Sequence, residues 1–182
     1  MIKISGADAT FKICIFGEGG VGKTCLAQRF LTGLFDIDTK MTMGASLHVK
    51  YVNIDDLRIS LQIWDFGGEK DYRFLLPAYA LGSSAGIFMY DITRSSTIHK
   101  VEDWLNIFQV GLKKDISEVP LFLVGGKKDL EEKRSVDISL AQSISEQYNF
   151  KKIFETSAKT GENVELLFKR VTEFLLKKSE LI

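Results

Sequence analysis

Eight residues near the start of the chain constrain its fold more than any other feature: residues 17–24 read Gly-Glu-Gly-Gly-Val-Gly-Lys-Thr. An apolar run at residues 11–16 precedes this segment, and apolar residues at helical spacing follow it. Glycines allow backbone N–H groups to turn inward around an anion, and the helix that follows directs the positive end of its dipole at the same point. A glycine-rich turn without a chemical role would not require these flanking elements. We therefore predict a strand, a phosphate-binding loop and a helix, in that order.

Two side chains of this loop have a predicted role in binding phosphate and metal. Lys23 would reach the β- and γ-phosphates of a nucleotide, and the Thr24 hydroxyl would bind Mg²⁺. Backbone groups of the loop and of the first helical turn would surround the phosphates. The predicted phosphate-binding residues are Gly17, Gly19, Gly20, Val21, Gly22, Lys23, Thr24 and Cys25.

The composition limits which partners the chain can have. Lysine plus arginine and aspartate plus glutamate balance at 24 each in 182 residues, so no basic excess is available for nucleic acid or an anionic membrane. Cys14 and Cys25 fall in the first strand and the first helix and lack zinc-ligand spacing, which predicts buried free thiols in a reducing compartment. We therefore expect a cytoplasmic protein that binds no nucleic acid.

Nothing in the sequence predicts direct attachment to a membrane. No apolar stretch is long enough to span a bilayer, the start Met1-Ile2-Lys3 carries no secretory or myristoylation signal, and the last cysteine is Cys25. Two lysines near the end of the chain are too few for electrostatic attachment. We expect a monomer without a direct lipid anchor, whose membrane association, if any, is mediated by a partner.

Strand-like and helix-like segments alternate along the chain, which predicts a mostly parallel sheet covered by helices. Two apolar runs flank Asp55-Asp56 and predict a hairpin, hence one antiparallel strand. We expect a single domain over residues 1–182 with a core of about 11–176. The predicted strands are 11–16, 46–54, 58–65, 85–90, 120–124 and 152–156. The predicted helical stripes are Ile98, Val101, Leu105, Phe108 and Leu112; Ile138, Ala141, Ile144 and Tyr148; and Val164, Leu167, Phe168, Val171 and Phe174.

In an open sheet of this kind, ligands bind beyond the carboxyl ends of the strands. The loop after the run at 58–65 begins within the segment Trp-Asp-Phe-Gly-Gly-Glu, residues 64–69. Asp65 is the expected second anchor for Mg²⁺, through a water, and Gly68 would let its backbone N–H meet the γ-phosphate. A plain turn is the alternative interpretation. The phosphate loop earlier in the chain favours the functional one.

Two further loops make the chain similar to a known family. Residues 125–129 read Gly-Gly-Lys-Lys-Asp, and residues 155–159 read Glu-Thr-Ser-Ala-Lys. All these motifs occur in the order and at the spacing of small GTPases of the Ras superfamily, and residues 11–176 resemble its Rab-like and Ras-like branches. Without an anchor, the chain is similar to prokaryotic, particularly archaeal, relatives. The resemblance implies a P-loop NTPase three-layer α/β sandwich, with a six-stranded mostly parallel sheet, one antiparallel strand, about five flanking helices, and GTP or GDP with Mg²⁺ as cofactors.

By this resemblance, Asp129 would accept hydrogen bonds from N1–H and the exocyclic amine of guanine. Adenine lacks this donor pair, and sites of this kind can reject the wrong partner by about 10⁴-fold or more. The Lys127 stem would lie over one face of the base, with Phe35 near the other. The Ala158 backbone N–H would meet the guanine oxygen, and Lys159 would add packing. The implied base-binding residues are Phe35, Lys127, Asp129, Ser157, Ala158 and Lys159.

The resemblance also implies a molecular switch. Thr42 would ligate Mg²⁺ only when a γ-phosphate is present, although by itself it is an ordinary loop threonine. GTP would order residues of about 37–45 and 66–80, and hydrolysis would release them, so that effector, exchange and activating proteins read the difference. The implied catalytic residues are Lys23, Thr42, Gly68 and Glu69, and the implied metal ligands are Thr24, Thr42 and, through water, Asp65.

Three apolar residues match an effector-binding patch of Rab-like proteins. They are Leu47, Trp64 and Tyr79, with leucine in place of the usual aromatic at the first position. The alternative is that these residues simply lie on a sheet face that a helix covers, because periodicity in one chain does not distinguish an exposed face from a covered one.

The chain departs from the family pattern at Gly126, where the family has asparagine. That side chain normally ties the base loop to the phosphate loop, so its loss should weaken nucleotide binding by about 1–3 kcal/mol. Asp129 keeps guanine as the expected base. The alternative is an NTPase with relaxed base specificity.

A second departure is Glu69, which replaces the water-positioning glutamine of the family. Glutamine can donate and accept hydrogen bonds, whereas an ionised glutamate can only accept. Its charge would also repel the γ-phosphate by about 3 kcal/mol at roughly 5 Å and a dielectric constant of about 20, which is about two decades in rate. We expect slow hydrolysis. The alternatives are a glutamate that acts as general base, one that points to solvent, and a module that binds nucleotide without hydrolysing it.

Overall fold

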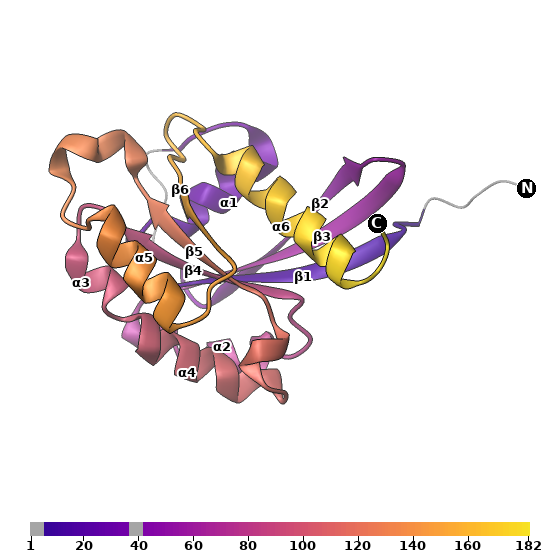
Figure 1. Ribbon diagram of the computed structural model, residues 1–182, viewed down its shortest axis with the longest axis horizontal. Helices are drawn as coiled ribbons and strands as arrows, with labels where there is room; N and C mark the ends of the chain where they lie inside the picture. Colours follow the sequence, from indigo (N-terminus) through magenta and orange to yellow (C-terminus); the bar gives the residue numbers. More distant parts are fainter. Residues whose placement is uncertain (1–5, 37–41) are drawn as a thin grey trace, which may run out of the picture.

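A six-stranded sheet runs through the centre of the molecule and is covered by helices on both faces (Figure 1). The computed structural model describes residues 6–36 and 42–182. The strand order is β2-β3-β1-β4-β5-β6; β2 pairs antiparallel with β3, and all other pairs are parallel. The strands are β1 (Ala9–Phe16), β2 (Ala45–Ile54), β3 (Leu57–Phe66), β4 (Ala85–Asp91), β5 (Leu121–Gly126) and β6 (Lys152–Glu155). The predicted sheet, with its single antiparallel strand, is confirmed.

Helices fill the connections between the strands. The α-helices are α1 (Lys23–Thr32), α2 (Leu75–Ala80), α3 (Ser95–Ile98), α4 (Val101–Leu112), α5 (Ile138–Gln147) and α6 (Val164–Lys178). Three 3₁₀ helices are η1 (Lys70–Tyr72), η2 (Ile116–Glu118) and η3 (Lys128–Lys133). The first apolar stripe, predicted to lie on one helix from Ile98 to Leu112, is divided between α3 and α4. The division occurs because Lys100 leaves helical geometry at φ −86° and ψ 6°. The described residues therefore form six α-helices where about five were predicted, and the additional one is the short α3.

Two separate apolar layers lie on the two faces of the sheet. Successive side chains of a strand point to opposite faces. Ile13 and Ile15 of β1 therefore join the layer under α1 and α6, whereas Cys14 and Phe16 join the layer under α2, α4 and α5. Figure 1 shows these two sets of helices on opposite sides of the sheet. Because both faces are covered, the central strands are continuous apolar runs without alternation.

Aromatic rings connect the helices of each layer to the sheet or to each other. On one side, the Phe30 ring of α1 stacks on Phe168 of α6 with centroids 3.9 Å apart. On the other side, Phe16 of β1 stacks on Phe108 of α4 at 4.7 Å, next to the fully buried Trp104. These contacts join α1 to α6 on one face of the sheet and β1 to α4 on the other.

Two residues lie in a different environment from the predicted one. Ile138 begins the second predicted stripe but is 57% exposed, because it is the first residue of α5 and lies beyond the part of the helix that faces the sheet. Cys25 was expected to be buried and is only partly so, because it borders a pocket at the start of α1. Cys14 is buried as expected, and both cysteines are free thiols.

The carboxyl ends of five parallel strands meet at one edge of the sheet. The loops that leave this edge follow Phe16, Phe66, Asp91, Gly126 and Glu155. The predicted nucleotide-site residues lie on these loops, at the adjoining ends of β3 and α1, or on the segment before β2. Of the predicted first switch region, 37–45, residues 37–41 lie outside the described residues.

Candidate functional site

Two adjoining pockets open at this edge. The larger one, about 440 Å³, lies over the phosphate loop, and the smaller one, about 260 Å³, is mainly apolar and lies beside it. The larger pocket is lined by Gly19, Gly20, Gly22, Lys23, Thr24, Cys25, Phe35, Asp36, Thr42, Phe66, Gly68, Glu69 and Lys127. The smaller pocket is lined by Val21, Gly22, Cys25, Phe35, Met89, Lys127, Asp129, Leu130, Ala158 and Lys159. Of the predicted site residues, Gly17, Asp65 and Ser157 line neither pocket.

The phosphate loop has the backbone that its glycines allow. Gly17, Gly20 and Gly22 have φ angles of 142°, 70° and 103°, a region that favours glycine. Gly17, the first residue of the loop, lies against β4, where a Cβ would clash with the Met89 carbonyl group. The Lys23 amine lies inside the turn and donates to the carbonyl of Gly17 at 2.8 Å. The loop is therefore preformed around a buried cation.

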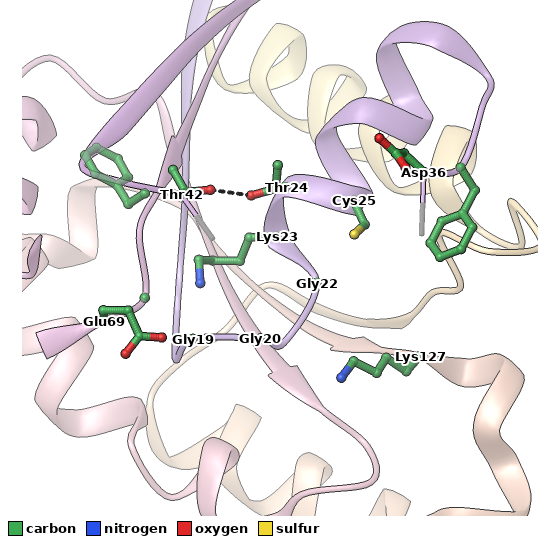
Figure 2. A pocket seen from close by; sticks show the side chains of 13 residues that line it. Gly19, Gly20, Gly22, Lys23, Thr24, Cys25, Asp36, Thr42, Glu69 and Lys127 are labelled. Atoms are coloured by element: carbon green, nitrogen blue, oxygen red, sulfur yellow. Dashed lines mark hydrogen bonds between the residues drawn. The ribbon is translucent and has the colours of Figure 1, made fainter. Parts of the chain in front are cut away.

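The protonation of Lys23 reflects this burial. Removal from water lowers the pKa of Lys23 to about 8, although the carboxylates of Asp65, Glu18 and Glu69 oppose the shift. A phosphate next to the amine would stabilise its charged form. Figure 2 shows the Lys23 side chain within the loop, between Thr42 and Glu69.

Three oxygen-bearing side chains from distant segments meet at the start of α1. The Thr24 hydroxyl lies 2.7 Å from the Thr42 hydroxyl, as Figure 2 shows, and donates to Asp65 Oδ2 at 2.6 Å. Thr42 Oγ1 lies 3.5 Å from the same carboxylate oxygen. In the described part of the chain, no group of three or more His, Cys, Asp or Glu side chains is arranged to hold a metal ion.

This cluster fits Mg²⁺. Hard oxygen ligands about 2.1 Å from an octahedral ion lie about 3 Å from one another, which is close to the separations found here. Asp65 Oδ1 is buried without a hydrogen-bond partner, so it has an unused acceptor that a metal-bound water could fill. Burial raises the pKa of Asp65 despite the hydrogen bond from Thr24. A nearby divalent cation would relieve the cost of that buried charge.

The segment after β3 lies against the phosphate loop. A Cβ on Gly68 would clash with the backbone of Glu18 and Gly19, so only glycine fits at this position. Glu69 is exposed, but its carboxylate faces Gly19, where a Cβ would also clash with it. Figure 2 shows this carboxylate directed at the loop. The alternative in which Glu69 points away from the site therefore does not describe the structure.

The smaller pocket brings together five of the six predicted base-binding residues, and the sixth, Ser157, contacts one of them. Asp129 Oδ1 accepts a hydrogen bond from the Ser157 hydroxyl at 2.6 Å, which fixes the carboxylate at the rim of the pocket. Lys127 has a left-handed backbone, with φ 66°, and its amine lies 2.7 Å from Asp91 Oδ2. Burial alone would raise the pKa of Asp91, but hydrogen bonds from Lys127 and Thr93 outweigh it and leave the pKa lowered.

Arg94 is a part of the site that sequence reasoning missed. Its guanidinium donates to the Gly19 carbonyl at 2.7 Å and pairs with Asp91 at 3.1 Å. It therefore links the loop after β4 to the phosphate loop. The feature of the sequence that could have indicated this contact is Asp91, an acidic residue that ends a buried strand at the functional edge.

A second missed cluster connects the phosphate loop to the predicted second switch region. The Glu18 carboxylate pairs with Arg73 and accepts from Trp104 Nε1 at 2.9 Å, while the Arg73 guanidinium lies over the Trp104 ring at 4.8 Å. Each residue alone looks like an ordinary loop or core residue. Only the fold brings the three segments together.

The three residues of the predicted effector patch lie next to one another. Leu47 pairs with Trp64 across β2 and β3, and the Trp64 ring lies 5.0 Å from Tyr79 of α2. Leu47 is 48% exposed and Tyr79 37% exposed, while the indole N–H of Trp64 is buried without a partner. Part of the patch is therefore open to solvent, and part is covered by α2.

Comparisons with known proteins agree with these motifs. The family model described as Ras family matches residues 12–177. The human Ras-related protein Rab-19 is 33% identical over 174 residues, which cover 96% of this chain and 79% of that protein. RABE1e of Arabidopsis thaliana, also named a Ras-related protein, is 35% identical over 165 residues, which cover 90% and 74%. The GTP-binding protein yptV2 of Volvox carteri is 34% identical over 174 residues, which cover 95% and 78%.

Membership of this family rests on nearly the whole chain and on a structure with the expected sheet. Within the described residues, no helix is both long and apolar enough to cross a bilayer. The matched segment contains every loop of the functional edge, from the phosphate loop to residues 155–159. The chain therefore belongs to the Ras family of small GTPases and is Rab-like.

Proposed function

We propose that this protein binds GTP and GDP together with Mg²⁺ and hydrolyses GTP slowly, as a switch that controls the binding of partner proteins. The observation that carries the proposal is the meeting of Thr24, Thr42 and Asp65 oxygens within 3.5 Å, beside a preformed phosphate loop. A pocket for a base, with Asp129 at its rim, adjoins this cluster. Together these features fit a nucleoside triphosphate with its metal ion.

The proposed role of each residue follows from its position. Lys23 would neutralise the β- and γ-phosphates, Thr24 and Thr42 would hold Mg²⁺, and Asp65 would hold it through a water. A Mg²⁺ ion held by these residues would supply positive charge that offsets the charge of the phosphates. Thr42 lies before β2 and Gly68 after β3. Thr42 would reach the metal ion and the Gly68 N–H the γ-phosphate, so loss of the γ-phosphate would release both segments. The residues that hold the base are Phe35, Lys127, Asp129, Ser157, Ala158 and Lys159.

Family membership implies regulators and effectors that read the switch regions. We propose that Leu47, Trp64 and Tyr79 contribute to the surface that effectors contact. The exposure of Leu47 and Tyr79 supports this proposal. The two free thiols support a reducing compartment such as the cytoplasm.

Slow hydrolysis is proposed because Glu69 faces the phosphate loop. An ionised glutamate cannot donate to the γ-phosphate, and its charge opposes the charge that develops there. Solvent screens part of this repulsion, because Glu69 is exposed. The Arg94 guanidinium, which donates to the Gly19 carbonyl, offsets part of it.

The test is single-turnover hydrolysis of GTP with Mg²⁺ by the wild-type protein and by Glu69→Gln. We expect the variant to hydrolyse GTP about 10–100 times faster, because the repulsion is removed and a donor is gained. Glu146→Gln, an exposed position on α5, is the matched control and should leave the rate unchanged.

Other outcomes would identify a different mechanism. A rate that collapses in Glu69→Gln would mean that Glu69 is the general base. A wild-type protein that retains GTP, with no gain in the variant, would favour a binding module set only by loading and exchange.

Alkylation of the two cysteines tests occupancy of the proposed site. Cys25 borders both pockets, whereas Cys14 is buried and burial raises its pKa to about 11. N-ethylmaleimide at pH 7.5 should therefore modify Cys25 alone, because the thiolate is the reactive form. GDP at about ten times its Kd should slow this reaction about tenfold. Mass spectrometry of the modified protein is the measurement, and equal rates with and without GDP would contradict the proposed location.

A further inference from the structure

Gly126, the departure from the family's asparagine, is the last residue of β5 and is buried at the base loop. The space that a side chain would enter here is already occupied. A Cβ on Gly126 would clash with the terminal methyl group of Met89 and, at 2.8 Å, with the Val21 carbonyl oxygen. The glycine is therefore matched to a neighbour that fills its side-chain position.

That neighbour is the methionine of the adjacent strand β4. Met89 is 2% exposed, yet it lines the smaller pocket together with Val21 and Asp129. Its terminal methyl group also lies 3.6 Å from the position of a Cβ on Gly22. The end of the Met89 side chain thus lies between the base loop and the phosphate loop and borders the pocket.

We propose that Met89 is a positioning residue that takes over the link between the two loops. The proposal rests on the proposed function, because it concerns the guanine-nucleotide site. A thioether has no hydrogen-bond donor and only a weak acceptor, so the link consists of close apolar contact with the backbone of both loops. Methionine suits this place because its unbranched, flexible side chain fills irregular gaps.

The same geometry makes positions 89 and 126 depend on each other. An asparagine at Gly126 needs the volume that the Met89 methyl group occupies. Met89 is otherwise enclosed, and the open space that it borders is the pocket for the base. A displaced methionine would therefore enter the space that guanine needs. A small residue at position 89 would remove the clash with the methionine, while the close contact with the Val21 carbonyl oxygen would remain.

The test is a double-mutant cycle on the affinity for GDP. Gly126→Asn and Met89→Ala are each expected to raise the Kd for GDP about tenfold, the first by a clash and the second by a lost contact. Independent effects would multiply to about 100-fold, but the double variant is expected to bind GDP only about tenfold more weakly than the wild type, because the methionine clash is absent and only the contact with Val21 remains. Met89→Leu, which conserves volume, should also stay within about threefold.

A core variant separates positioning from packing. Ile87 lies on the same strand and in the same apolar layer as Met89 but borders neither pocket, so Ile87→Ala is the matched core variant. It should lower the unfolding midpoint, leave the GDP Kd within about twofold, and gain nothing from Gly126→Asn.

Two results would overturn the proposal: singles whose effects multiply in the double variant, or a Gly126→Asn variant that binds GDP more tightly than the wild type. A wild-type protein that binds no guanine nucleotide would instead overturn the proposed function. In that case the unfolding midpoints without nucleotide still test the contact. The unfolding midpoint of Gly126→Asn should be lower than that of the double variant Met89→Ala/Gly126→Asn. The reverse order would refute the proposed contact.

Discussion

Replacing Lys23 with alanine is expected to weaken the binding of GDP and GTP by about 100-fold or more. The amine is buried inside the phosphate loop and is held by the carbonyl groups of Gly17 and Glu18, each at 2.8 Å. A preorganised cation in a site with little water interacts strongly with phosphate, and its removal leaves the phosphate charge uncompensated. Equilibrium titration with a fluorescent GDP analogue measures the loss.

Two controls accompany this prediction. Lys100→Ala removes an exposed lysine that pairs with Asp103 at 3.1 Å, and it should leave the GDP affinity unchanged. Circular dichroism of Lys23→Ala would establish that the sheet is intact, because Lys23 also contacts the loop backbone. Affinity within twofold of the wild type in a folded Lys23→Ala variant would mean that the nucleotide binds elsewhere.

Replacing Asp129 with asparagine is expected to change which base the protein prefers. The carboxylate can accept from both N1–H and the exocyclic amine of guanine, whereas an asparagine amide faces the base with one acceptor and one donor group. GDP should therefore lose up to about 10⁴-fold in affinity, and XDP, which has a carbonyl in place of the amine, should gain. The Ser157 hydroxyl, which now donates to Asp129, can donate equally to the asparagine oxygen and keep it in place.

Competition between GDP and XDP for the fluorescent nucleotide measures this change. Asp56→Asn, at the exposed tip of the β2–β3 hairpin, is the matched control and should keep the wild-type preference. An unchanged ratio of GDP to XDP affinity in Asp129→Asn would show that another group reads the base.

Much of this site could be predicted because local sequence determines it. The phosphate loop follows from its glycines and from the strand and helix around it, and the sheet follows from apolar runs separated by helical stripes. Asp65 and Gly68 lie at the edge of the sheet because the carboxyl ends of parallel strands meet there. These features depend on neighbours in the sequence or on rules of topology.

The features that could not be predicted depend on contacts between distant segments. Met89 lies in a buried apolar strand, where nothing in the sequence separates a residue that borders a pocket from one in the core. Glu18, Arg73 and Trp104 come from three elements and meet only in the fold. The exposure of Ile138 has the same origin, because helical period does not say how far a helix extends past the sheet.

The most direct test of the proposed switch is calorimetric titration of the nucleotide-free protein with GTP, GDP and ATP, with Mg²⁺ and again with EDTA. We expect GTP and GDP to bind at least about 10³-fold more tightly than ATP, because Asp129 would be left unpaired by adenine. We also expect GTP to bind more weakly in EDTA, because Thr24, Thr42 and Asp65 would lose their metal ion. Equal affinity for ATP and GTP, or GTP binding that does not respond to Mg²⁺, would contradict a magnesium-dependent guanine-nucleotide switch.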